Sequence, residues 1–404
     1  MLLRHLPLSL ETYYLPKKEL MNLFWGGVAR RISIILLSLF SPIYIYKSMR
    51  DSGLSFKIVI LLVISFYILE QLAKLMTIAA SENLSQKIGF KGVMRASALP
   101  FFLFILVMFF AKDFLILFPI ALIAVGIHSG FYWWGYHGYF IKTGDEKHFG
   151  VSISEAGFLE TLASVATPIA GALITNYFGF GMIFIIAALF MTLAFVLIGK
   201  DHDKRQRRDV KLKEVFALIK RLKSISLAYI GSGGEVTTYG VVWPLFLFLF
   251  FGQVISMGQI VSLAALVASI FSLAVGQWVD KQGEKTIVKV GSPLVFLSWV
   301  IRAVDRSFAS FVFADSFWNF GERMVALPLN VLTYKKALEG KSSARAILFR
   351  EISVIIGSLF SLVLLLISFL ILGTLDGVFW ISAFFALFPL VAVIRKKLVD
   401  KYND

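Results

Sequence analysis

Several ionisable side chains lie inside long apolar runs of this chain, where a charged group is costly. Five of them could take up and release a proton: Glu70, His128, Glu160, Glu235 and Glu322. Ionisable residues within membrane spans usually face a cavity or one another, and they often mark proton or ion pathways. Histidines and carboxylates can change charge when their surroundings change. These residues therefore predict a proton-coupled process, with structural pairing or packing as the alternative for each.

Glu235 has unusual neighbours, because glycines and hydroxyl residues surround it in segment 231–238. Such residues weaken a helix, and a bent or unwound helix exposes its backbone to a cavity. Desolvation disfavours the charged form of a buried carboxylate. We therefore expect a weakened helix here and Glu235 as a proton carrier. The alternative is a packed helix with a satisfied carboxylate.

Segment 315–323 carries a second group of polar side chains. Asp315 and Glu322 are seven residues apart, so a helix would place them on one face, about 10 Å apart along its axis. Arg323 points to a different face from its neighbour Glu322 and could pair with another span. The candidate substrate-cavity residues of this segment are Asp315, Trp318, Asn319 and Arg323.

An internal offset connects this segment with an aromatic one earlier in the chain. Shifting Glu322 back by 194 positions lands on His128, so both halves would hold an ionisable group at equivalent depth. A core histidine and an internal Glu–Arg pair are the alternative. Three aromatic residues after His128 are candidates for the cavity wall: Tyr132, Trp133 and Tyr136. Their alternative role is an interfacial aromatic belt.

Other charged residues fit gate or packing roles. Glu70 and Lys74 are four residues apart, so they share a helix face and can pair. Glu155 and Glu351 fall near equivalent places in the two halves, and Arg350 adjoins Glu351. We expect these residues to act as gate or packing elements.

Composition identifies the surroundings of the chain. Hydrophobic residues make up 58% and charged residues 16% of the 404 positions, whereas a soluble domain carries about 25% charged residues. The net charge of +15 lies in short links between apolar runs, which argues against a nucleic-acid partner. With no cysteine, five scattered histidines and no nucleotide-binding or hydrolase motif, we expect no metal, no cofactor and no enzyme activity.

A membrane-crossing helix needs about 20 mostly apolar residues. The expected fold class is therefore an all-α membrane protein with twelve transmembrane helices in two pseudo-symmetric six-helix bundles. The spans are expected at about 25–48, 57–80, 92–111, 114–140, 151–175, 178–199, 225–250, 255–277, 287–304, 308–333, 346–372 and 375–394.

The expected organisation follows from the same runs. An N-terminal bundle with an amphipathic leader helix covers 1–199, a basic linker with an interfacial helix covers 200–224, and a C-terminal bundle covers 225–404. Lysine and arginine concentrate in the links on one side of the membrane, which predicts that both termini are cytoplasmic. No cleavable signal is evident, so we expect the first span to serve as an uncleaved anchor. We also expect a monomeric, multi-pass protein of the inner membrane.

One basic turn occurs twice, 194 positions apart. The complete copy, in segment 276–285, contains Gly276, Asp280, Lys281, Gly283 and Lys285. The partial copy, in segment 82–91, contains Gln86, Lys87, Gly89 and Lys91. Two amphipathic segments, 18–24 and 213–219, repeat at nearly the same offset and precede the first and seventh spans. The sequence therefore indicates a duplicated bundle.

Twelve spans, a duplicated half, a central basic loop and the complete turn together resemble the major facilitator superfamily. The resemblance implies alternating access around a cavity lined by spans 1, 4, 7 and 10. It also implies that Asp280 latches the halves by contacting the start of span 5, with Gln86 as a weaker counterpart. Pro168 and Gly171 in span 5 match part of the antiporter signature of that family; the arginine often found in its span 4 is absent here, where His128 lies near mid-span.

The expected function is secondary active transport, with protons, a small-molecule substrate and the lipid bilayer as partners. Efflux of an amphipathic organic solute by proton antiport is the first expectation. Proton symport or facilitated uptake of a sugar or other small polar metabolite is the alternative. A membrane-embedded transferase acting on lipid substrates, or a non-transporting sensor, is a remote one.

Overall fold

The computed structural model describes residues 18–144, 149–199, 210, 212–269, 278, 281–339 and 342–394, and its elements in this part of the chain are helices. The N-terminal half consists of α1 (Lys18–Asp51), α2 (Phe56–Ala96), α3 (Ala98–Phe110), α4 (Leu117–Thr143), α5 (Phe149–Phe178) and α6 (Phe180–Ile198). The C-terminal half consists of α8 (Lys223–Phe251), α9 (Val254–Ser269), α11 (Glu284–Val304), α12 (Phe308–Glu339), α13 (Ser343–Leu372), α14 (Gly377–Ala386) and α15 (Phe388–Ile394). The short α7 (Leu212–Arg221) precedes α8, as the expected interfacial helix should.

Nine stretches of the described chain are long and apolar enough to cross a membrane. One of them, Phe56–Phe110, spans 55 residues and breaks at Gly89, which leaves room for two crossings. Two of the expected spans, α12 and α9, are not among these nine stretches. The charged residues of α12 lower its hydropathy, and the described part of α9 is too short. With these allowances the helices agree with the expected twelve spans.

The chain reverses at Gly89 and returns along α4. Before the break, Thr77 packs on Gly130; after it, Phe90 packs on Gly138, and Ser97 bonds to His128. Residues before Gly89 therefore contact positions progressively nearer the C-terminal end of α4, and residues after Gly89 contact positions progressively nearer its N-terminal end. This places the second and third spans side by side against the fourth.

The duplication is visible in the backbone. Gly89 and Gly283, 194 positions apart, both have positive φ angles of 74° and 81°. Gly179 and Gly373 repeat the pattern at the same offset, with φ angles of 79° and 70°. Glycine adopts this conformation at little cost, whereas other residues are strained in it. The turns at Gly89 and Gly283 fold alike, because their ψ angles of 175° and 154° are also similar. Gly179 and Gly373 share only the positive φ, since their ψ angles are 175° and 2°.

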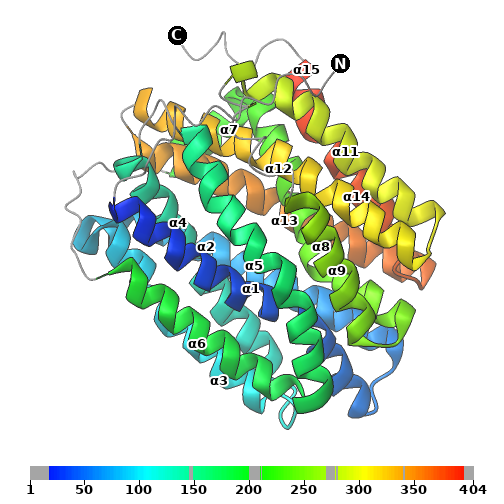
Figure 1. The fold of residues 1–404 in the computed structure, drawn as a ribbon. Coiled ribbons are helices and arrows are strands. Elements are labelled where there is room, and N and C mark those ends of the chain that lie inside the picture. The colour runs from blue at the N-terminus through cyan, green and yellow to red at the C-terminus, as the bar shows by residue number, and fades with distance from the viewer. Residues whose placement is uncertain are drawn as a thin grey trace.

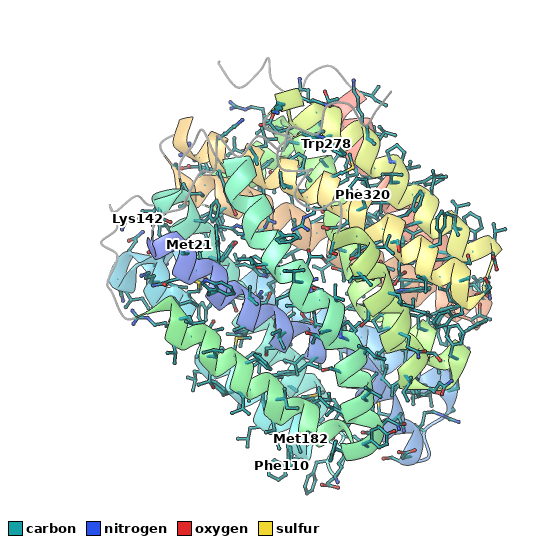
Figure 2. The ribbon with its side chains drawn as sticks, viewed as in Figure 1. Met21, Phe110, Lys142, Met182, Trp278 and Phe320 are labelled. Atoms are coloured by element: carbon teal, nitrogen blue, oxygen red, sulfur yellow. The ribbon has the colours of Figure 1, made fainter. Side chains whose placement is uncertain are left out.

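The two halves lie beside each other, with α1 to α6 on one side and α8 to α15 on the other (Figure 1). The most extensive contacts between them join α1 with α8, α2 with α13, and α5 with α9. We call the end where α1 begins and α15 ends the terminal end, and the opposite end the far end. Figure 2 shows Met21 and Lys142 near the terminal end and Phe110 and Met182 at the far end.

At the far end the halves meet through apolar and small side chains. Tyr46 packs edge-on against Phe248, with 6.3 Å between ring centroids, and Phe56 packs against Phe369 at 6.0 Å. The close approach of Gly258 to Ala172 joins α9 to α5. This contact excludes water through shape rather than through charge.

The expected weak helix at segment 231–238 is wrong, because α8 is continuous from Lys223 to Phe251. Its glycines instead allow other helices to approach. A Cβ on Gly233 would overlap the carbonyl of Val354 in α13, and a Cβ on Gly357 would overlap that of Ile230 in α8. Small residues at helix contacts in membranes serve this purpose.

This packing predicts opposite effects for two substitutions in α8. Gly233→Ala should destabilise the protein by about 1–3 kcal/mol, because the new methyl group meets backbone. Gly240→Ala is the matched control, since a Cβ there has nothing within 4 Å, and alanine favours the helix by about 1 kcal/mol over glycine. Thermal unfolding of the purified variants, followed by fluorescence, measures both. Equal melting temperatures would contradict the packing role of Gly233.

Candidate functional site

A buried ionic cluster joins the two halves about two helical turns inside the terminal end. We call it the seam; it comprises Lys74 of α2, His137 of α4, Asn330 and Tyr334 of α12, and Arg350 and Glu351 of α13. The carboxylate of Glu351 is 1% exposed. It lies 3.2 Å from the Nζ of Lys74 and also pairs with its neighbour Arg350. One buried anion therefore holds cations from both halves.

His137 occupies the centre of the seam. Its Nε2 accepts a hydrogen bond from the Nη1 of Arg350 at 3.0 Å, so its Nδ1 carries the proton and lies 2.7 Å from the Tyr334 hydroxyl. The Nε of Arg350 donates to Asn330 at 3.1 Å. His137 is 1% exposed, so it lies inside the protein rather than at its surface.

The seam changes the expected pairing of Lys74. The nitrogen of Lys74 is paired with Glu351 of the other half, rather than with Glu70 four residues earlier on its own helix. Glu351 and Arg350 occupy the boundary between the halves, where a gate would lie. Glu155 lies in α5, but its side chain is outside the described residues.

The expected latch is described only in part, because Gly276 and Asp280 lie outside the described residues. Lys281 and Lys285 are exposed, and so is Lys87 of the other copy. Gln86 donates to Glu82 on its own helix at 3.2 Å. Lys91 is buried, with its nitrogen 4.8 Å from the centroid of the Tyr139 ring. The latch role of these residues remains a prediction.

Glu235 and Glu322 line one small cleft inside the C-terminal half. The Oε1 of Glu235 accepts hydrogen bonds from two indoles, Trp299 at 2.6 Å and Trp318 at 2.5 Å. Glu235 is 3% exposed, and it forms no ion pair with any residue that the structure describes. Neutral donors hold its position without requiring it to stay ionised.

The sequence suggested Asp315 as a cavity residue, but the structure buries its side chain within the C-terminal half. It is 0% exposed and paired with Arg302, whose Nε and Nη2 lie 3.1 and 2.5 Å from its Oδ1. Its Oδ2 accepts from Tyr239 and Trp243. Two other residues of this segment also have partners within the same half: Trp318 stacks on Tyr239 at 3.4 Å, and Asn319 donates to the Asp315 carbonyl. Asp315 is therefore part of the packing of its half.

Arg30 and Arg31 of α1, which sequence reasoning did not single out, lie near a third charged group. The guanidinium of Arg30 sits 3.8 Å above the centroid of Tyr132 and 4.9 Å from that of Trp133. The Nε of Arg31 donates to Ser164 of α5 at 3.2 Å. The sequence signal that could have identified these residues is the occurrence of two adjacent arginines inside the first apolar span.

Glu160 and Arg323 complete this region. A Cβ on Gly27 would lie 3.0 Å from the Oε1 of Glu160, so the carboxylate touches α1 one turn before the arginines. Arg323 donates to Thr161 across the boundary between the halves at 2.8 Å. Glu160 interacts electrostatically with all three arginines. We call Arg30, Arg31 and Arg323 the arginine cluster.

The remaining candidates serve the N-terminal half. The Nδ1 of His128 lies 2.9 Å from the Ser97 carbonyl, and its ring packs on Phe101; its buried Nε2 has no partner in the described chain. Tyr136 stacks on Tyr132. In α5, the Pro168 carbonyl faces Gly258 of α9, and Gly171 packs on Phe40 of α1. In the part of the chain that the structure describes, no three acidic or histidine side chains are grouped so that they could hold a metal ion.

The Asp315–Arg302 pair predicts a structural phenotype. Asp315→Asn leaves Arg302 buried without a counter-charge, which should cost about 3–5 kcal/mol of stability. The double variant Arg302→Met, Asp315→Leu removes both charges and should recover most of that loss. Melting temperatures of the three proteins measure this. If Asp315→Asn were as stable as the wild type and had lost only solute binding, the structural role would be contradicted and Asp315 would be a cavity residue.

Comparisons with known proteins agree with this architecture. A family model described as Major Facilitator Superfamily matches residues 23–358. The crystal structure of the human organic anion transporter MFSD10 (TETRAN) superposes with a TM-score of 0.72 at 15% identity, covering 93% of this chain and all of that one. An auto-inhibited POT family peptide transporter superposes with a TM-score of 0.72 at 10% identity, covering 96% of this chain and 98% of its own. No curated protein matches the sequence. The chain therefore belongs to the major facilitator superfamily.

Proposed function

We propose that this protein is a proton-coupled secondary transporter that moves an amphipathic organic solute by alternating access. Membership of a transporter family supports transport. The seam is the observation that carries the proposal, because it joins the two halves through groups that water can solvate. When the halves separate at this end, water can solvate the charges of Lys74 and Glu351, whereas separating an apolar contact would expose hydrophobic surface.

The cleft between Glu235 and Glu322 is our candidate for the proton site. Two carboxylates in one small cleft repel each other when both are ionised, so one of them favours a proton. The indoles of Trp299 and Trp318 donate to Glu235 and can bond to it in either charge state. A carboxylate held by neutral donors can therefore exchange a proton without collapse of its site.

For direction we propose efflux by antiport, with the terminal end in the cytoplasm of an inner-membrane protein. The partial antiporter signature around Pro168 and Gly171 supports antiport. The exposed lysines at the terminal end, including Lys87, Lys281 and Lys285, support the orientation. We propose that the transporting unit is a monomer, because the seam lies within one chain.

Proton symport into the cell is a second mode, and the arginine cluster favours it. A solute with negative charge would need protons to enter against an inside-negative potential. Glu160 lies among the three arginines and would accept a proton more readily when an anionic solute neutralises them. The two modes differ in the relative direction of proton and solute.

Proteoliposomes with an internal pH dye test the coupling. Solute gradients are imposed with lipophilic cations, lipophilic anions, sugars and amino acids. We expect solute-driven pH change for the wild type, and at least a tenfold lower rate for Glu235→Gln or Glu322→Gln, because an amide cannot carry the proton.

Glu284→Gln is the matched control. Glu284 is a carboxylate outside the cleft: it is the first residue of α11 at the terminal end, is partly exposed and pairs with Lys335 at 2.8 Å, so its variant should keep the coupling. Proton and solute moving in opposite directions supports antiport, and movement together supports symport. Solute flux without pH change in the wild type would refute proton coupling.

A further inference from the structure

We propose that the arginine cluster binds the anionic group of the solute, so that the protein transports amphipathic organic anions. The inference deepens the proposed function and rests on it. Its basis is the juxtaposition of Arg30, Arg31 and Arg323 near Glu160, with Arg30 over the rings of Tyr132 and Trp133.

The three arginines of the cluster form no ion pair with a residue that the structure describes. Within the described chain, the paired cations of the membrane region are Lys74, Arg350 and Arg302, and the arginine cluster is not among them. The cluster's contacts are hydrogen bonds to neutral hydroxyls, from Arg31 to Ser164 and from Arg323 to Thr161. Charges inside a membrane protein are costly unless paired or functional. A solute anion would supply the missing partner.

Arg30 provides an independent observation. Its Nε is buried and has no hydrogen-bond partner in the described residues, while its guanidinium face rests on the Tyr132 ring. Cation–π contact holds the group without using its N–H donors. An unpartnered buried N–H is rare and costly, and an incoming oxyanion would satisfy it.

The charges of the region leave a positive surplus. Glu160 and Glu322 both interact electrostatically with members of the cluster. Three guanidinium groups and two carboxylates leave one surplus positive charge with both acids ionised, and more when either is protonated. This balance favours a solute with one negative charge over a neutral or cationic one.

Access and shape indicate the rest of the solute. Arg31 is exposed, whereas Arg30, Glu160 and Arg323 are half-buried. An anionic head can therefore meet Arg31 first, and its aromatic or apolar body can lie on Trp133 and Tyr136, which pack edge to face. Arg323 comes from the other half and contacts Thr161, so the head would touch both halves at once. Guanidinium groups suit carboxylate and sulfonate oxygens because of their planar fork of donors.

Three ligands with the same ring system and different charge test the inference: 1-naphthalenesulfonate, 1-naphthol and 1-naphthylmethylammonium. Binding to the purified full-length protein is measured by calorimetry, and flux in proteoliposomes. We expect the sulfonate to bind at least tenfold more tightly than the other two. Arg31→Gln and Arg323→Gln should weaken it about tenfold or more, through loss of a charge-assisted hydrogen bond, whereas Arg31→Lys should retain part of the affinity.

Lys57→Met removes an exposed cation at the far end and should leave binding unchanged. Equal or tighter binding of the naphthol or the ammonium compound, no sulfonate binding, or a sulfonate affinity indifferent to Arg31→Gln and Arg323→Gln would overturn the inference. Sulfonate binding that needs both arginines but produces no flux would keep the anion site and refute transport. Flux of the ammonium compound alone would keep transport and refute the anion site.

Discussion

The buried carboxylate of Glu351 is the constraint on which the arrangement of the two halves depends. It is shared by Lys74 from one half and Arg350 from its own, with His137 and Tyr334 completing the bonds. A buried charge of this kind is stable only while its partners stay in place. The far end is joined differently, by ring contacts such as Tyr46 with Phe248 and by the small residues of α5 and α9. Ion pairs therefore close the terminal end of the molecule, and the close packing of apolar and small side chains closes the far end.

This asymmetry gives each charged group a distinct task. The Arg302–Asp315 pair holds α11 to α12 inside one half and does not cross the boundary. Glu235 and Glu322 face a cleft within that same half, and Glu322 adjoins Arg323 on α12. The arginine cluster lies where α1, α5 and α12 approach one another. Proton site, solute site and seam would then be coupled through α12, because Glu322, Arg323 and Tyr334 all belong to it.

Sequence reasoning recovered the features that are local or periodic. Apolar runs gave the helices, and the 194-residue offset appears again in the turns at Gly89 and Gly283. It failed where partners depend on which helix faces meet. Lys74 has a carboxylate four residues away, yet pairs with Glu351 of the other half. Asp315 looks like a cavity acid until Arg302 of the preceding helix is seen beside it. Composition likewise marks the glycines near Glu235 but does not reveal the helix that packs on them.

The most direct test of the account is a spin-label distance measurement across the seam. The chain has no cysteine, so exposed positions Lys87 and Lys281 can be labelled at the terminal end, and Lys57 and Gln253 at the far end. In Glu351→Gln, the account predicts longer distances between labels 87 and 281, because Lys74 and Arg350 lose their shared anion. In the same variant, the distances between labels 57 and 253 at the far end should be unchanged or shorter. Distributions at 87–281 that superimpose on those of the wild type would contradict the claim that the seam holds the terminal end closed.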